Sequence, residues 1–259
     1  MTKAIFISGA GAGIGRATAL KFLAEGWRVG AFDINIEALD NLREVAQAGE
    51  RLVTGVLDVT DAASWQQALA SFAGDSGIDL LFNNAGILYS GAFETISLEA
   101  QQRMLRVNVE GVLAGSYAAL PYLVRAGAQG VARVINMSSA SAIYGQPSLA
   151  SYSASKFAVR ALTEALSIEW EAKNIQVMDI MPLFVQTSMV TDMDAGSIKC
   201  LGVRLTAEDI ANTAFRMAHY RGNKVHWPVG WQTKLLALGA KVSPSWLTRF
   251  SNKHIGRNN

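Results

Sequence analysis

The sequence predicts an α/β fold in which a doubly wound parallel sheet of about seven strands is flanked by helices. Short apolar or β-branched runs alternate along the whole chain with segments whose apolar residues recur three and four positions apart, the pattern of strands alternating with helices. Several early runs are apolar throughout, as expected when helices cover both faces of a sheet. A length of 259 residues suits one large domain of this class.

The expected strands, in chain order, are residues 3–8, 28–33, 51–58, 78–82, 133–137, 175–181 and 224–229. Helical periodicity fills the intervals between them, most clearly in RATALKFLAEG and FAVRALTEALSIEW. We expect residues 1–231 to form the domain. Residues 232–259 are expected to be a basic C-terminal extension docked on it, which Gly239 and Pro244 break into short pieces.

The composition narrows the class of protein. Half of the residues are hydrophobic and 17% are charged, which allows a large buried core and leaves little room for disorder. The single cysteine, Cys200, excludes an intramolecular disulfide framework and suits a reducing compartment. No apolar run reaches the ~18 residues of a membrane-spanning helix, and we see no signal peptide. We therefore expect a soluble, cytoplasmic protein.

The net charge of +2 is unevenly distributed along the chain. Eight Lys or Arg residues and no Asp or Glu follow Asp209, whereas the first 209 residues hold 15 basic and 21 acidic residues. We favour a basic tail that lies over the acidic body or is solvated. Contact with a phosphate-bearing substrate or an anionic membrane surface is the alternative. The basic residues are too dispersed to indicate nucleic-acid binding.

A membrane-surface anchor is a further interpretation of this tail, because apolar side chains are interspersed with its basic residues: Leu235, Leu236, Leu238, Trp246, Leu247 and Phe250. Such an anchor needs a continuous amphipathic helix. Gly239 and Pro244 are expected to interrupt that helix, so membrane contact is not the favoured interpretation.

A glycine-rich turn, in IFISGAGAGIGRATALKFL, joins the first expected strand to the first expected helix. Gly9, Gly13 and Gly15 let a pyrophosphate approach the backbone, and the helix N-terminus offers N–H donors. Asp33, at the end of the second strand, can accept hydrogen bonds from both adenosine ribose hydroxyls and would repel a 2′-phosphate. No Lys or Arg stands immediately before Gly13 or after Asp33, and we interpret Arg16 as a packing or solvated residue. The sequence therefore predicts NAD(H) rather than NADP(H).

Tyr152 and Lys156 are four residues apart in a helical segment, so they share a face of that helix. A free tyrosine titrates near pH ~10, and a neighbouring ammonium lowers that pKa. Such a tyrosine can exchange a proton with a carbonyl or an alcohol. Taken alone, the spacing also fits a solvated lysine beside a half-buried tyrosine.

These residues make the chain resemble the short-chain dehydrogenase/reductase family up to about residue 230. Ser8-Gly9-x-x-x-Gly13-Ile14-Gly15 looks like the family's cofactor turn, Asp58-Val59 like its adenine-contacting pair, and Asn83-Asn84-Ala85-Gly86 like its fourth-strand signature. The residues that match its catalytic group are Asn108, Ser139, Tyr152 and Lys156. The resemblance implies a single-domain Rossmann fold with the strand order 3-2-1-4-5-6-7.

The resemblance also implies roles for these residues. Tyr152 would be the acid or base at the substrate oxygen, and Ser139, preferred over its rival Ser138, would orient that oxygen. Lys156 would lower the pKa of Tyr152 and bind the nicotinamide ribose, and Asn108 would hold a water that links Lys156 to solvent. The implied cofactor contacts are Gly9, Gly13, Ile14, Gly15, Asp33, Asp58, Val59, Asn84, Ala85, Gly86, Tyr152, Lys156, Val185 and Thr187.

Leu183 departs from the family pattern, which commonly has Pro-Gly where this chain has Pro182-Leu183. Leucine disfavours positive φ, so either the backbone differs there or the side chain occupies a pocket, and we expect it to narrow the substrate mouth. Residues 183–202, with Met189 and Met193, resemble a mobile lid, although ordinary helix packing fits them equally well.

The expected substrate pocket also includes residues 88–95 and 140–149, which are apolar with few charges. We therefore expect an uncharged, fairly hydrophobic secondary alcohol or ketone as substrate of an NAD(H)-dependent oxidoreductase. The alternatives are a reductase of 3-oxoacyl thioesters and a dinucleotide-binding protein without catalysis. No catalytic metal is expected, because His219, His226 and His254 show no ligand spacing. The resemblance implies a homodimer or homotetramer formed through helices holding residues 100–126 and 151–172.

Overall fold

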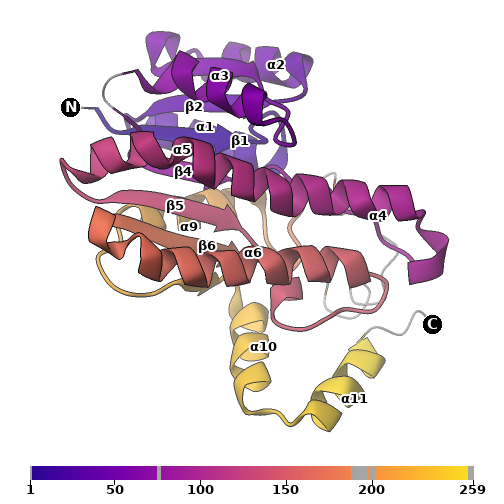
Figure 1. The fold of residues 1–259 in the computed structure, drawn as a ribbon. Helices are drawn as coiled ribbons and strands as arrows, with labels where there is room; N and C mark the ends of the chain where they lie inside the picture. The colour runs from indigo at the N-terminus through magenta and orange to yellow at the C-terminus, as the bar shows by residue number, and fades with distance from the viewer. Residues whose placement is uncertain (1, 75–76, 188, 190–197, 199–201, 256–259) are drawn as a thin grey trace.

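The computed structural model describes residues 2–74, 77–187, 189, 198 and 202–255. Its centre is a parallel sheet of seven strands in the order β3-β2-β1-β4-β5-β6-β7. Helices cover the two faces of this sheet (Figure 1). The predicted fold class and strand order are both confirmed.

The strands are β1 (Ala4–Ser8), β2 (Arg28–Asp33), β3 (Leu52–Val56), β4 (Leu80–Asn83), β5 (Ala132–Met137), β6 (Ile175–Met181) and β7 (His226–Pro228). The α-helices are α1 (Gly13–Ala24), α2 (Ile36–Ala46), α3 (Ala62–Ala73), α4 (Leu98–Leu105), α5 (Gly111–Gly127), α6 (Ala150–Glu169), α9 (Ala207–Ala218), α10 (Trp231–Val242) and α11 (Ser245–Ile255). Short 3₁₀ turns are η1 (Gly49–Arg51), η2 (Phe93–Thr95), η4 (Ala140–Ala142) and η5 (Glu171–Lys173), and η3 (Arg106–Glu110) is a π-helical turn.

Two of the observed strands, β3 and β7, are each three residues shorter than the sequence predicts. β3 begins one residue later than expected because Arg51 belongs to η1, and it ends before Asp58 because that residue starts a turn in which its carboxylate accepts the Thr60 N–H. β7 is an edge strand that pairs with β6 over three residues only. The bounds of the other five strands agree with the predicted ranges to within two residues.

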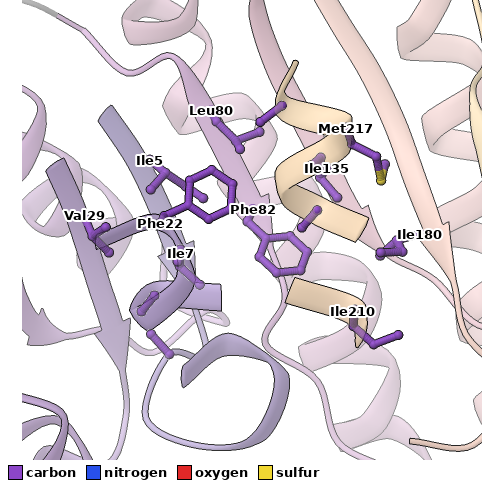
Figure 2. Close-up of a cluster of buried hydrophobic side chains, with 14 of the residues drawn as sticks. Ile5, Ile7, Phe22, Val29, Leu80, Phe82, Ile135, Ile180, Ile210 and Met217 are labelled. Carbon is purple, nitrogen blue, oxygen red and sulfur yellow. The ribbon is translucent and has the colours of Figure 1, made fainter. Parts of the chain in front are cut away.

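The apolar strands bury side chains on both faces of the sheet, which explains why they lack an alternating pattern. Ile5 and Ile7 enter one core, packed under α1 and α9, and Figure 2 shows them beside Phe22 and Phe82. Phe6, from the same strand, enters the opposite core with side chains of α3 and α5. Successive residues of β1 therefore point into opposite cores, and the sheet is packed on both faces.

The C-terminal extension differs from its prediction. Gly239 does not break the chain, because α10 runs through it from Trp231 to Val242. A glycine inside a helix costs about 1 kcal/mol relative to alanine, which the packing of α10 on β7 and η4 offsets. Pro244 does separate α10 from α11. No helix among the described residues is long and apolar enough to cross a membrane.

His226 fastens the edge strand to the helix layer. Its Nδ1 lies 3.0 Å from both carboxylate oxygens of Asp179 on β6, and its Nε2 lies 2.8 Å from Glu164 Oε1 on α6. Asp179 is completely buried, so its burial raises its own pKa. The hydrogen bond to Asp179 raises the pKa of His226, against the opposing effect of burial. The protonated imidazole therefore stabilises this corner of the sheet.

Replacing His226 with Gln should lower the free energy of unfolding by roughly 1–3 kcal/mol near pH 6, because the buried carboxylate loses a charged partner. A histidine whose pKa is raised on folding stabilises the fold below its unfolded pKa of about 6.5, and this contribution disappears as the pH rises through the folded pKa. Urea unfolding of both proteins should therefore show a smaller difference near pH 9. An equal difference at both pH values would contradict this assignment. The matched control is His219→Gln, because the ring of His219 is hydrogen-bonded to the Phe215 carbonyl rather than to a carboxylate.

Candidate active site

The carboxyl ends of the parallel strands form one edge of the sheet, and there the structure has a cavity of about 580 Å³. Ligands of doubly wound sheets bind at this edge. The predicted site residues that line the cavity are Gly9, Gly13, Ile14, Asp33, Asp58, Val59, Asn84, Ala85, Gly86, Ser139, Tyr152, Lys156, Val185 and Thr187. A larger depression, of about 1870 Å³, lies where strands begin, near Ala4, Arg28 and Ile175, and none of the predicted site residues lines it. We therefore take the smaller cavity as the site.

The β1–α1 turn exposes its backbone to the cavity because its glycines carry no side chains. Close contacts explain why other residues would not fit at two of these positions. Gly9 has a φ of +69°, and a Cβ on it would lie 2.7 Å from Ala85 Cα. A Cβ on Gly15 would lie 2.0 Å from the Gly9 carbonyl oxygen, so Gly15 lies beneath the turn and does not line the cavity. The α1 N-terminus has no side-chain cap at Ala12. Its N–H groups are thus suited to a pyrophosphate.

Asn84 and Ser8 hold this turn against the end of β4. Asn84 Nδ2 donates to the carbonyl oxygens of Ser8 (3.1 Å) and Gly9 (2.9 Å). Ser8 Oγ in return accepts from the backbone N–H groups of Asn84 and Ala85, each at 3.2 Å. Hydrogen bonds from the Asn83-Asn84-Ala85-Gly86 segment therefore help to fix the floor of the cavity.

Asp33 lies at the far end of the cavity, with its carboxylate held by the backbone. Oδ2 accepts from Gly11 N–H at 2.9 Å, and Oδ1 accepts from Asn35 N–H at 3.0 Å. Arg16 donates to Asn41 Oδ1 at 2.9 Å, so its guanidinium is engaged with α2. Backbone N–H groups thus fix the position of the Asp33 carboxylate at the cavity wall.

Asp58 and Val59 form the neighbouring wall. The Asp58 carboxylate accepts from the N–H and the hydroxyl of Thr60, at 2.9 and 2.7 Å. The Val59 carbonyl accepts from Trp65 Nε1 at 3.1 Å, and the Val59 side chain is buried. This wall therefore offers an apolar surface next to a carboxylate whose position is set by its own turn.

Tyr152, from the first turn of α6, meets Ser139 at the end of β5. The two hydroxyls are hydrogen-bonded, and Ser139 Oγ also accepts from the Ser141 N–H at 3.1 Å. Ser138 Oγ is buried without a hydrogen-bond partner in the described structure. The bond to Tyr152 therefore distinguishes Ser139 from its rival.

The pKa of Tyr152 is not lowered, contrary to the expectation from sequence. Part of the ring is exposed to the cavity, but burial raises the pKa of the phenol to about 12, and the Ser139 hydrogen bond acts in the opposite direction. Lys156 Nζ does lie on the same face, 5.5 Å from the ring centroid of Tyr152. Its hydrogen bond, however, goes to the Met137 carbonyl at 2.8 Å. Burial lowers the pKa of Lys156 to about 8, so the ammonium is still the main form at neutral pH.

Asn108 lies behind the cavity rather than in its wall. It is fully buried in η3, where a π-helical turn joins α4 to α5, and such turns are frequent at functional sites. Its Nδ2 donates to the Ile87 carbonyl (2.9 Å) and to Ser155 Oγ (3.2 Å), and its Oδ1 accepts from the Ile87 N–H (2.8 Å). Both amide hydrogens are therefore used inside the protein. These bonds hold Ile87 and α6 in place around Asn108. A water could bind Asn108 only by donating a hydrogen bond to its side-chain or backbone oxygen.

The segment after β6 closes the cavity opposite the glycine turn. A Cβ on Gly13 would lie 3.2 Å from Thr187 Cγ2, and Thr187 Oγ1 donates to the Val185 carbonyl at 3.4 Å. Leu183 lines the cavity without positive φ, so the backbone accommodates this side chain at the place where the family commonly has glycine. Met189 also lines it. Most of the predicted lid, including Met193, lies outside the described residues.

Sequence reasoning missed several cavity residues. Arg103 and Arg106, one helical turn apart just before Asn108, bring positive charge to the wall, and that spacing was the available signal. Gln146 and Leu149, by contrast, belong to the segment 140–149 that was expected to line the pocket, and they do line the cavity. Met137 contributes a backbone carbonyl to Lys156, for which the sequence carries no signal.

Comparisons with known proteins point to one family. The short chain dehydrogenase family pattern matches residues 3–197. The dehydrogenase LinX of Sphingobium indicum, named for 2,5-dichloro-2,5-cyclohexadiene-1,4-diol, is 35% identical over 199 residues, which are 76% of this chain and 78% of LinX. The 3-oxoacyl-[acyl-carrier-protein] reductase FabG of Thermotoga maritima is 34% identical over 189 residues, 72% of this chain and 76% of FabG.

A solved structure gives the same result. The 3-ketoacyl-(acyl-carrier-protein) reductase of Brucella melitensis, complexed with NADH, superimposes with a TM-score of 0.80 at 26% identity. The match covers 88% of this chain and 96% of that one. With the glycine turn, the seven-stranded order and the Ser139–Tyr152–Lys156 cluster all in place, the chain belongs to the short-chain dehydrogenase/reductase family of oxidoreductases.

Proposed function

We propose that this protein is an NAD(H)-dependent oxidoreductase that interconverts an uncharged, fairly hydrophobic secondary alcohol and its ketone. The observation that carries the proposal is the convergence of Ser139, Tyr152 and Lys156 with the glycine turn in one cavity at the carboxyl edge of the sheet. A proton-exchanging phenol and a dinucleotide cradle in the same space suit hydride transfer. A protein that only bound a dinucleotide would not need this cluster.

The cavity fits a nicotinamide dinucleotide. Gly9, Gly13 and the α1 N-terminus would hold the pyrophosphate, and Asp33 would accept the adenosine ribose hydroxyls. Val185 and Thr187 would contact the carboxamide. A bound nicotinamide would supply or accept the hydride at the substrate carbon. The fixed charge of Asp33 favours NAD(H), because a 2′-phosphate would meet it directly.

The residues of this chain suit the reductive direction at neutral pH. A phenol with a pKa of about 12 is protonated there, so Tyr152 is a donor to the carbonyl oxygen. The Ser139 hydroxyl donates a second hydrogen bond to that oxygen and orients it. When the proton leaves Tyr152, the Lys156 ammonium stabilises the phenolate. Alcohol oxidation runs the same proton transfer backwards and needs the ionised phenol.

A second candidate is a reductase of 3-oxoacyl thioesters on an acidic carrier or coenzyme. Arg103 and Arg106 in the cavity wall favour it, because a phosphate-bearing substrate arm would be attracted there. The relatives from Thermotoga maritima and Brucella melitensis carry this activity in their names. A KM that rises steeply with salt for such thioesters, but not for small ketones, would favour this candidate over the first.

We also propose that the protein forms a homodimer or homotetramer. Leu113 and Tyr117 on α5 are 50% and 83% exposed, and Phe157 and Ile168 on α6 are 41% and 75% exposed. Exposed apolar side chains gathered on two neighbouring helices are typical of an interface between copies.

Tyr152→Phe should reduce kcat by about 10²–10⁴-fold, because the substrate oxygen loses its proton donor. Binding of NADH, followed by its fluorescence, should change little, since the ring and its packing remain. Tyr220→Phe, at the opposite side of the sheet, is the matched control and should keep full activity. Turnover by Tyr152→Phe close to wild type would refute the proposed role.

Asp33→Ser should lower the preference for NAD over NADP, measured as the ratio of kcat/KM values, by about tenfold to a hundredfold. One repulsive charge contact with a 2′-phosphate is worth roughly 1–3 kcal/mol at a partly solvated site. Asp40→Ser, on the surface of α2, controls for the loss of a negative charge nearby. A ratio unchanged by Asp33→Ser would show that cofactor choice depends on other residues.

Leu183→Gly should raise kcat/KM for bulky ketones relative to small ones by about tenfold. The physical reason is that a few methylene groups in an apolar pocket change the ratio of kcat/KM values for two substrates by about this factor. Leu183→Ala should give an intermediate value. A panel of secondary alcohols and ketones, assayed with NAD(H), provides the measurement. If all three proteins have the same substrate profile, Leu183 does not shape the substrate mouth.

A further inference from the structure

The C-terminal helices carry an apolar surface that the domain leaves uncovered. On α10, Thr233 is fully buried, whereas Trp231, Leu235 and Leu238 are 61%, 59% and 63% exposed. Positions i, i+4 and i+7 lie along one face of a helix. α10 therefore uses one face for docking on the domain and presents an apolar stripe to solvent.

The second helix also exposes apolar side chains. Trp246, Leu247 and Phe250 of α11 are 69%, 37% and 57% exposed, and Trp246 and Phe250 are one helical turn apart. Asn252, farther along α11, donates to the Gly145 carbonyl at 3.3 Å and ties the helix to the loop that follows η4. In Figure 1, α10 and α11 lie outside the layers formed by the sheet and its helices. Both apolar faces are thus held in place and remain accessible.

The charges of the extension have a single sign. Residues 232–259 contain five Lys or Arg and no Asp or Glu. Lys234, Arg249 and Lys253 are exposed, and no ion pair joins them to an acidic side chain within the part of the chain that the structure describes. The expectation that this tail lies over the acidic body through its charges therefore finds no contact here. Its basic groups are available to an anionic partner.

Apolar and basic groups together indicate the chemistry of that partner. An amphipathic helix with Trp and Leu on one face and Lys or Arg beside them binds in the plane of an anionic lipid surface. α10 has 12 residues and α11 has 11, so each is about 18 Å long and suits contact along a surface. A second copy of the chain is a less complementary occupant, because two such helices would bring like charges together.

We propose that α10 and α11 bind this protein reversibly to anionic membrane surfaces. Gly239 was the first of two residues expected to prevent this, and it lies inside α10. Pro244 divides the anchor into two helices and leaves both apolar faces exposed. Because α11 contacts the loop at Gly145, which continues to Gln146 and Leu149 of the cavity, the bound protein holds its substrate mouth close to the lipid.

Flotation of the full-length protein with vesicles tests the proposal without reference to catalysis. The protein should float with vesicles of phosphatidylcholine mixed with phosphatidylglycerol and much less with phosphatidylcholine alone, and added salt should weaken the binding. Lys234→Gln/Arg249→Gln/Lys253→Gln should weaken it by about fivefold for each residue neutralised. Leu235→Gln/Leu238→Gln with Trp246→Gln should weaken it by at least about tenfold, since the apolar stripes are lost.

Ile36→Gln/Val45→Gln is the matched control, because it removes two exposed aliphatic side chains from α2 and should leave flotation unchanged. Thermal unfolding, which should be unaltered, verifies that each variant folds. Failure of wild type to float, or equal flotation with both kinds of vesicle, would overturn the proposal. A third outcome would also overturn it: the Leu235→Gln/Leu238→Gln/Trp246→Gln variant floats like wild type but sediments as a smaller species. The apolar side chains of the wild type would then contact a second copy of the chain.

Discussion

The burial of the Lys156 ammonium is the constraint on which the rest of the site depends. A buried cation must be hydrogen-bonded, and here the acceptor is the Met137 carbonyl at the end of β5. That bond fixes α6 relative to the sheet and places Tyr152, one turn earlier, against Ser139. Gly86 is part of the same constraint, because a Cβ on it would lie 3.8 Å from Lys156 Nζ and 3.2 Å from Asn108 Oδ1. The Ser139–Tyr152–Lys156 cluster and the Asn83-Asn84-Ala85-Gly86 segment are therefore packed against each other.

The same burial determines the proton chemistry. Removing the phenol from water disfavours the phenolate and raises the pKa of Tyr152, while it disfavours the ammonium and lowers the pKa of Lys156. Both effects bring the pair towards neutral forms. At neutral pH Tyr152 therefore keeps its proton and Lys156 remains mainly an ammonium.

Much of the fold was predictable because it depends on local pattern. Apolar runs such as KAIFIS contribute side chains to both cores, so their pattern predicts a sheet that is covered on both faces. The glycines of the β1–α1 turn could be recognised for physical reasons too, since Gly9 and Gly15 leave no room for a Cβ and Gly13 has a φ of +51°. These motifs carried the resemblance to the family, and the resemblance in turn implied the strand order. Spacing favoured Ser139 over Ser138, and it is Ser139 that is hydrogen-bonded to Tyr152.

Features that depend on tertiary contacts were not predictable. The direction of the Tyr152 pKa is set by how deeply the hydroxyl is buried, which the spacing of Tyr152 and Lys156 does not report. Gly239 looked like a helix breaker, yet packing on β7 and η4 outweighs its small intrinsic cost. The side-chain bonds of Asn108 to Ile87 join segments 21 residues apart, and no local signal marks them.

Titration of Tyr152 tests the central claim that burial keeps the phenol protonated. The protein would be labelled with ¹³C at the tyrosine Cζ, and comparison with Tyr152→Phe would assign the resonance among the six tyrosines. An ordinary tyrosine titrates near pH ~10. Because the pKa of Tyr152 is about 12, the account predicts that its resonance does not shift below that pH in the protein alone. A midpoint near neutral pH in the protein alone would contradict it.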